Sequence, residues 1–207
     1  MFKTPSIAII ATLIYAPTFA DTPKFGEEAT VAVLSTLTLG TDQTAEFAKF
    51  SEKPRYFGAF YINPFGGQSF RVSDYGSLKA ARETAENRCN TDASPAKCQL
   101  YAVSVPKGQD AKSDDLVGFS QGATIDFNEE YLTQQREGRF GAFAVSKGVS
   151  YGYTWDWNSQ AEAEASALLF CEADMLEDLA KVYIVEREFS TKAGYTTCKI
   201  THSYSSN

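Results

Sequence analysis

The chain has 207 residues, a formal net charge of −7 and 22% charged residues. An acidic chain without a cluster of Lys or Arg lacks the basic patch that nucleic-acid binding requires, and it is not attracted to anionic membranes. Charged residues of both signs are scattered along the chain, which is typical of a solvated surface.

The first 20 residues have the pattern of a cleavable signal peptide. Lys3 precedes an apolar stretch at residues 6–16, Pro17 ends that stretch, and Ala20 stands before the expected cleavage site. The stretch is too short for a membrane-spanning helix, which needs roughly 20 apolar residues. An uncleaved amphipathic anchor is the weaker alternative. The sequence therefore predicts a periplasmic or extracellular protein without a transmembrane segment in the mature chain.

An even number of cysteines in an exported chain indicates disulfide bonds. No two of them have the C-x-x-C spacing of a redox dithiol or a zinc knuckle, so no metal site and no cofactor is predicted. The four cysteines are Cys89, Cys98, Cys171 and Cys198.

Two parts of the chain resemble each other and predict an internal repeat. Residues 56–60 (YFGAF) recur as residues 139–143 (RFGAF). Downstream, Ser77 and Ser159 each begin a helix-like stretch with Ala at the fourth and eighth following positions and Cys at the twelfth. The matching residues are Ala81, Ala85 and Cys89 in the first copy and Ala163, Ala167 and Cys171 in the second.

Each copy predicts a strand, a turn, a second strand, a helix and a third strand, after a polar stretch. In the first copy these elements are expected at residues 57–63, 69–73, 77–89 and 98–105. In the second copy the last strand is expected at 181–187, followed by an extra hairpin arm at 196–204. Small alanines on the inner face of each helix predict close packing on the sheet.

The predicted fold class is α+β, with two pseudo-repeat αββαβ-like units that have antiparallel sheets and helices on one face. The units form one pseudo-symmetric domain or two abutting ones. The expected segments are a signal peptide at 1–20, an N-terminal arm at 21–41, unit 1 at 42–107, a linker at 108–125 and unit 2 at 126–207 with the hairpin arm.

The repeat favours one disulfide pairing. Cys89 ends the first helix and Cys98 begins the third strand, so the two are close in sequence and in predicted space. In the second copy the position that matches Cys98 falls near Ala180, and Cys198 lies on the extra arm. We therefore predict Cys89–Cys98 and Cys171–Cys198 bonds. One bond between the copies is the weaker alternative.

Residues 151–159 (YGYTWDWNS), followed by the alanines and the cysteine of the second helix, resemble the secreted bacterial repeat domain of unknown function. That family has aromatic-Gly-Tyr before a helix-capping Ser, alanines at four-residue spacing, a Cys and a later Cys. The resemblance covers most of residues 55–105 and 139–185. The first copy departs from it, since residues 69–73 (SFRVS) replace the aromatic row. The resemblance implies an extracytoplasmic disulfide-bonded domain without established catalytic residues.

Residues 118–122 (GFSQG) match the G-x-S-x-G nucleophile elbow of serine hydrolases. Ser120 and the only histidine, His202, with an Asp at 126, 156 or 174, preserve the Ser–Asp–His order of α/β-hydrolases. However, residues 111–115 (AKSDD) are charged where a buried strand should enter the elbow. The segment is interpreted as a linker turn, and a serine hydrolase is the minor alternative.

Four aromatic residues alternate along one predicted strand, so all four are expected on one side of it. They are Tyr151, Tyr153, Trp155 and Trp157. This row is the predicted binding site for a glycan, a peptide or an envelope protein, because Tyr and Trp give contact area at low entropic cost. The alternative, which is somewhat favoured, is that the row packs into the core.

The acidic residues Glu172, Asp174, Glu177 and Asp178 lack the spacing of a calcium loop and are interpreted as a solvated surface. The sequence thus predicts an exported, non-catalytic binding or interaction module. A serine hydrolase that uses Ser120 and His202, and a purely structural envelope protein, are the alternatives.

Overall fold

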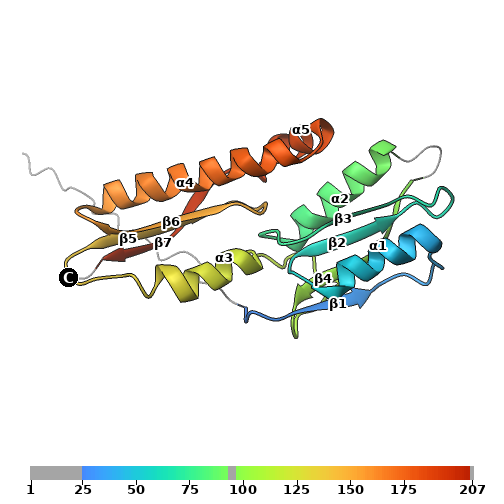
Figure 1. The fold of residues 1–207 in the computed structure, drawn as a ribbon, viewed down its shortest axis with the longest axis horizontal. Helices are drawn as coiled ribbons and strands as arrows, with labels where there is room; N and C mark the ends of the chain where they lie inside the picture. Colours follow the sequence, from blue (N-terminus) through green and yellow to red (C-terminus); the bar gives the residue numbers. More distant parts are fainter. Residues whose placement is uncertain (1–24, 93–96, 206–207) are drawn as a thin grey trace, which may run out of the picture.

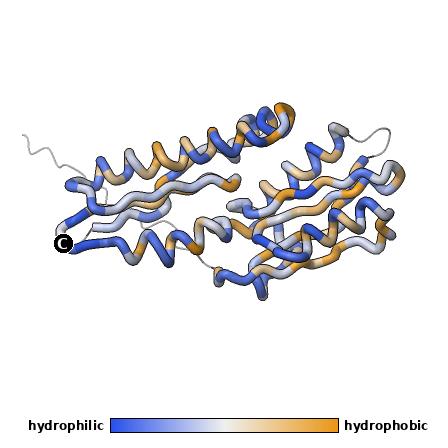
Figure 2. Tube along the Cα trace, viewed as in Figure 1, coloured by the Kyte–Doolittle hydropathy of each residue, from blue (hydrophilic) through white to orange (hydrophobic). Residues whose placement is uncertain are grey.

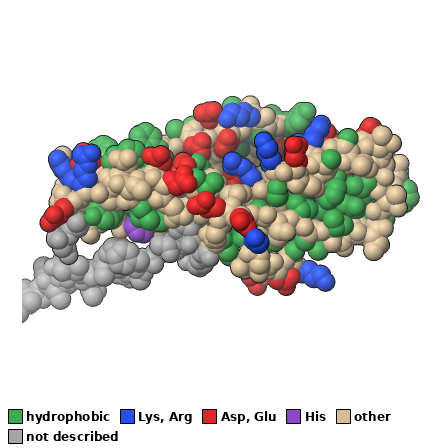
Figure 3. Space-filling view, turned by 60° about the horizontal axis from the view of Figure 1, so that its bottom comes forward, with side chains coloured by type: hydrophobic (Ala, Val, Ile, Leu, Met, Phe, Trp, Pro, Cys, Tyr) green, Lys and Arg blue, Asp and Glu red, His purple; other side chains and the backbone are tan. Residues whose placement is uncertain are grey.

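The computed structural model describes residues 25–92 and 97–205 of the chain (Figure 1). These residues form two antiparallel sheets with helices packed on them, which confirms the predicted α+β class. The expected signal peptide lies outside the described residues. No helix in the described ranges is both long enough and apolar enough to cross a membrane. Acidic and basic side chains are interspersed on the face shown in Figure 3.

The first sheet has the strand order β1-β4-β2-β3. Its strands are β1 (Ala29–Val33), β2 (Gly58–Ile62), β3 (Ser69–Val72) and β4 (Gln99–Pro106). Helices α1 (Thr41–Glu52) and α2 (Leu78–Asp92) lie on opposite faces of this sheet. Successive residues of β2 point to opposite sides and therefore contact different helices. Phe60 packs in a cluster with Phe50 of α1, whereas Ala59 packs in a cluster with Ala81 of α2. The helices thus cover both faces instead of the single face expected.

The second sheet has the strand order β6-β5-β7. Its strands are β5 (Phe140–Val145), β6 (Tyr151–Trp157) and β7 (Lys199–Ser205). Helix α4 (Gln160–Lys181) covers one face, and α3 (Gln121–Asp126) with the π-helical turn η1 (Phe127–Tyr131) covers the other (Figure 1). Ala142 faces α4, whereas its neighbour Phe143 faces η1. Each sheet therefore lies between two helical layers.

Residues 181–187, expected as the last strand of the second unit, form no strand and belong instead to the end of one helix and the start of the next. α4 ends at Lys181, and α5 (Ile184–Lys192) follows almost at once and packs against α2. The place of the third strand belongs to β7, which pairs with β5 as β4 pairs with β2. The residues expected to form an extra hairpin arm therefore contribute this strand. Cys198 directly precedes β7 as Cys98 directly precedes β4, so the two cysteines occupy equivalent places.

Both cysteine pairs have the expected partners. Cys89 and Cys98 have Cα atoms 6.0 Å apart, and Cys171 and Cys198 have Cα atoms 6.1 Å apart. Each bond joins a long helix to the residue before the third strand of its sheet. The inner-face alanines are fully buried, as predicted for helices that pack closely on a sheet. These alanines are Ala81, Ala85, Ala163 and Ala167.

Hydrogen bonds join the first half of the molecule, which contains the first sheet, to the second half, which contains the second sheet. The N–H of Gly76 donates to the carbonyl oxygens of Lys147 at 3.1 Å and Gly148 at 2.6 Å. The carboxylate of Asp74 accepts the backbone N–H groups of Gln121 at 2.7 Å and Gly122 at 3.2 Å. Asp74 thereby satisfies free donors in the first turn of α3, where a negative charge is also favourable. The first half thus fixes the helix that covers the second sheet.

Candidate functional site

The aromatic residues of β6 form a stacked ladder on one face of the second sheet. The rings of Tyr151 and Tyr153 lie 6.4 Å apart with 5° between their planes, and those of Tyr153 and Trp155 lie 5.8 Å apart. Phe143 of the neighbouring strand lies nearly parallel to both tyrosines. Three residues of the predicted row therefore share one side of the strand.

Trp157, the fourth residue of that row, lies on the other side. Asp156 has a left-handed φ of 65°, a conformation that Asp tolerates better than most residues. The pairing of β5 with β6 also shifts between Phe140 and Ala142, as in a β-bulge. This irregularity turns Trp157 toward Ala142 and α4. The expectation of four aromatic residues on one side is therefore wrong for Trp157.

Helix α3 holds the hydroxyl ends of the ladder. Asp126 accepts hydrogen bonds from the hydroxyls of Tyr151 at 2.9 Å and Tyr153 at 3.4 Å. Burial, reinforced by the Asp126 carboxylate, raises the pKa of Tyr151 and raises that of Tyr153 to about 12. Both tyrosines are half-buried, whereas Trp155 is 37% exposed. The ladder is thus mostly a packing layer, and Trp155 is its most open member.

Ser120 and His202, the alternative catalytic pair, make separate contacts. The hydroxyl of Ser120 accepts the backbone N–H of Ala123 at 3.2 Å and so caps α3, and Ser120 is only 4% exposed. Nδ1 of His202 lies 2.9 Å from the hydroxyl of Tyr131 in η1. In residues 25–92 and 97–205, no hydrogen bond joins Ser120 to His202, and no strand leads into the turn at Ser120. The hydroxyl of Ser120 serves as a helix cap.

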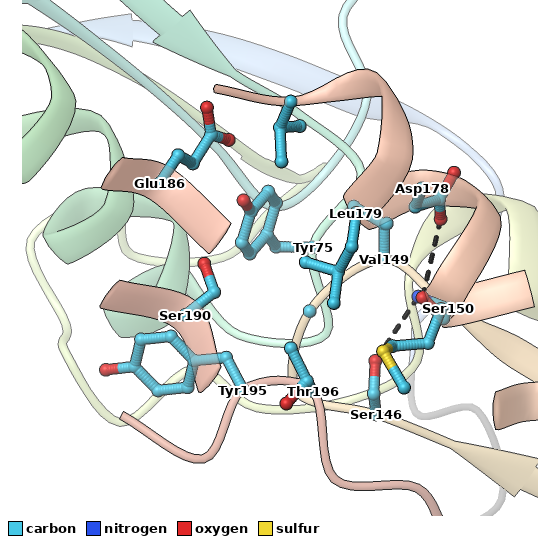
Figure 4. A pocket seen from close by; sticks show the side chains of 13 residues that line it. Tyr75, Ser146, Val149, Ser150, Asp178, Leu179, Glu186, Ser190, Tyr195 and Thr196 are labelled. Carbon is cyan, nitrogen blue, oxygen red and sulfur yellow. Dashed lines mark hydrogen bonds between the residues drawn. The ribbon is translucent and has the colours of Figure 1, made fainter. Parts of the chain in front are cut away.

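A cavity of about 50 Å³ lies where α4 and α5 meet the first half (Figure 4). Tyr75 projects between Glu186 and Ser190 of α5 on one side and Asp178 of α4 on the other. Burial raises the pKa of the Glu186 carboxyl, and the positive charge of Arg88 partly opposes this effect. Ligand pockets usually enclose roughly 300 Å³ or more. This cavity is therefore a packed junction between the halves.

Two of the four acidic residues near the end of α4 face the second sheet. Asp174 accepts the first backbone N–H of β6 at 3.2 Å, and Asp178 accepts the hydroxyl of Ser150 at 3.4 Å. Burial raises the pKa of Asp174. The predicted solvated surface is thus found for Glu172 and Glu177 only. Within the described ranges, no group of three or more His, Cys, Asp or Glu side chains is arranged to hold a metal ion.

The outer face of α4 carries an exposed apolar stripe, which we call the α4 stripe. Its members are all exposed and are spaced by three or four residues: Ala165, Leu169, Ala173, Leu176 and Ala180. At about 100° per residue, they lie on the side of the helix opposite Ala163, Ala167 and Cys171, which pack on the sheet. α4 is therefore apolar on two opposite faces, and Figure 2 shows hydrophobic residues recurring along its length.

Exposed hydrophobic side chains concentrate around this stripe. Of the ten large hydrophobic side chains that are exposed in the described residues, five lie on α4 or just after it: Leu169, Phe170, Leu176, Tyr183 and Ile184. A large exposed apolar patch marks an interaction site more often than scattered single residues do. Sequence reasoning missed this face because the inner alanines already explained the helical periodicity. The signal was the second set of apolar residues at the same spacing.

Comparison of the chain with family models, curated proteins and solved structures finds no match.

Proposed function

We propose that this protein is an exported, non-catalytic module that binds a partner protein through the α4 stripe. The observation that carries the proposal is the exposure of Leu169 and Leu176, which are 63% and 64% exposed on a helix whose opposite face is already buried. A partner that buries the remaining exposed part of these side chains would gain about 1–2 kcal/mol each, roughly two thirds of the value for a fully exposed leucine. The disulfides support export, because such bonds persist in oxidising compartments.

The charges around the α4 stripe favour one class of partner. α4 contains six acidic residues and one basic residue, Lys181. By helical geometry, Glu172 and Glu177 lie on the two sides of the stripe. Lys181 pairs with Glu177 at 2.8 Å, so it does not compensate Glu172. The complementary partner is an amphipathic helix with apolar residues at matching spacing and Lys or Arg at its flanks.

A second copy of this chain fits the stripe less well. A twofold dimer places the same surface on both sides of the interface, so carboxylates would face carboxylates. An anionic lipid surface would meet the same repulsion. The charge pattern therefore supports a cationic helix of another protein.

The proposal is tested with a synthetic, fluorescein-labelled helical peptide that has Leu at the a and d positions and Lys at the flanking positions. Its binding to the mature chain is measured by fluorescence anisotropy. The double variant Leu169→Ser/Leu176→Ser is expected to bind at least about tenfold more weakly, since each tenfold corresponds to about 1.4 kcal/mol. The matched control is Leu132→Ser, which removes an exposed leucine 43% accessible elsewhere on the surface.

A peptide with Glu in place of Lys is expected to bind more weakly than the Lys peptide. Equal binding of the Lys peptide by the double variant and by the Leu132→Ser control would overturn the proposal. Sedimentation tests whether a second copy of this chain binds the α4 stripe. A wild-type dimer that dissociates in the double variant would assign the stripe to that second copy instead.

A further inference from the structure

A second, larger pocket lies at the junction of the two halves. Its volume is about 450 Å³, within the range of small-molecule sites. Gly76 and the segment before α3 form one side, and the ends of β5 and β7 form the other. Interfaces between structural units are common places for ligand sites.

The pocket is lined by two lysines and by no acidic residue. Lys147 and Lys199 both border it, and both are exposed. Neither forms an ion pair with another residue in the described ranges. The whole chain carries a net charge of −7, so a pocket lined by two uncompensated ammonium groups is positive within an otherwise acidic protein. A concave site with charge of one sign concentrates ions of the opposite sign.

The rest of the wall is largely apolar. Val117, which is 48% exposed, Val145 and Phe119 are among the residues that line the pocket. The hydroxyl of Thr201 already donates to the carbonyl of Phe143 at 3.2 Å, whereas Thr197 is exposed and borders the pocket. A fully hydrated inorganic ion would gain nothing from this apolar wall, whereas an apolar group would be removed from water by it.

Backbone hydrogen bonds fix the walls before any ligand arrives. Gly118 donates to the carbonyl of Gly76 at 3.0 Å, and Gly76 donates to the loop that contains Lys147. Gly148 in that loop donates to the carbonyl of Tyr195 at 2.8 Å, close to the start of β7. A preformed pocket binds with a smaller ordering cost than one that must assemble.

We propose that this pocket binds a small organic anion. The carboxylate of the ligand pairs with the ammonium groups of Lys147 and Lys199, and its apolar body packs against Val117 and Val145. This site is separate from the α4 stripe and does not depend on the function proposed for that surface.

Octanoate is the probe, and its binding to the mature chain is measured by isothermal titration calorimetry. Octylammonium has the same apolar body with the opposite charge, and inorganic phosphate is an anion without an apolar body. Octanoate is expected to bind, and both controls are expected to bind at least about tenfold more weakly. The double variant Lys147→Met/Lys199→Met keeps much of the length of both side chains and is expected to lose at least about tenfold in octanoate affinity, because a hydrogen bond to a charged group contributes at least this much.

The matched control for the lysine variant is Lys192→Met, which removes an exposed lysine of α5 that does not line the pocket. Equal octanoate affinity in the double variant and in this control would overturn the proposal. Equal binding of octylammonium would show that charge plays no part. Phosphate that binds as tightly as octanoate, with the same dependence on the lysines, would refute the apolar part of the assignment.

Discussion

Gly152 of β6 lies directly against the backbone of α4 at Cys171. A Cβ atom on Gly152 would overlap the backbone nitrogen of Cys171 and would lie 2.7 Å from the carbonyl oxygen of Ala167. Cys171 is in turn bonded to Cys198, immediately before β7. β6 and β7 are the two outer strands of the second sheet. One residue of α4 therefore connects the helix to both edges of the sheet, by close packing at one and by a covalent bond at the other.

The first prediction concerns this close approach. Gly152→Ala is expected to destabilise the protein by about 1–3 kcal/mol, the usual effect of overpacking, because the new methyl group meets rigid helix backbone. The measurement is urea unfolding followed by circular dichroism. Gly26→Ala is the control, since nothing lies within 4 Å of a Cβ at Gly26. Equal stability of the two variants would show that α4 can move away from the sheet without cost.

The second prediction compares the two disulfides. The Cys171–Cys198 bond closes a sequence separation of 27 residues and the Cys89–Cys98 bond one of 9. The chain-entropy relation gives about 3.5 kcal/mol for the longer loop and about 2.6 kcal/mol for the shorter one. Replacing both Cys171 and Cys198 by Ala should therefore cost about 1 kcal/mol more in the free energy of unfolding than replacing both Cys89 and Cys98. The reverse order of the urea midpoints would contradict the entropic account.

Patterns that depend on neighbouring residues in the chain were readable from the sequence. The spacing of Ala163, Ala167 and Cys171 gave the buried face of α4, because helical periodicity is a local property. The cysteine pairing was also accessible, since each cysteine stands next to an element boundary. By contrast, residues 182–185 (VYIV) have the β-branched and aromatic composition of a strand, yet they lead into a helix. Contacts of α5 with α2 in the other half of the molecule override this local preference.

The aromatic row shows why the site was only partly predictable. Alternation places Tyr151, Tyr153 and Trp155 on one side, but the left-handed backbone at Asp156 reverses the pattern before Trp157. A bulge is set by pairing with another strand, so residue alternation in β6 alone does not reveal it. The outer face of α4 is recognised only when the residues that contact the sheet are set aside and the apolar residues that remain on the helix are considered.

The third prediction separates packing from exposure in the aromatic ladder. Phe143 is fully buried and contacts the rings of Phe119, Phe127 and Tyr131. Phe143→Ala is therefore expected to cost about 3–5 kcal/mol in the free energy of unfolding. Trp155→Ala should cost about 1 kcal/mol, since this ring is partly exposed and its main aromatic contact is one stacked neighbour. Urea unfolding measures both, and a larger loss for Trp155→Ala would show that Trp155 has the greater packing role.

The fourth prediction concerns the only histidine. Burial lowers the pKa of His202 below its usual value of 6.5, and the ring is enclosed by the rings of Tyr131 and Phe127. The folded state thus binds the proton of His202 more weakly than the unfolded state does. Stability must therefore be lost as the pH falls from about 6.5 toward the lower pKa of the folded protein.

His202→Gln removes this titration and retains a polar group that can hydrogen-bond to the Tyr131 hydroxyl. The free energy of unfolding of the wild type, minus that of the variant, is expected to decrease as the pH is lowered from 7.5 to 5. Asp174 and Glu186, whose pKa values are raised by burial, also titrate on acidification, but they are present in both proteins and cancel in the difference. Urea unfolding at several pH values measures this difference. A constant difference would mean that the protonated imidazole is accommodated in the folded protein as well as in the unfolded chain.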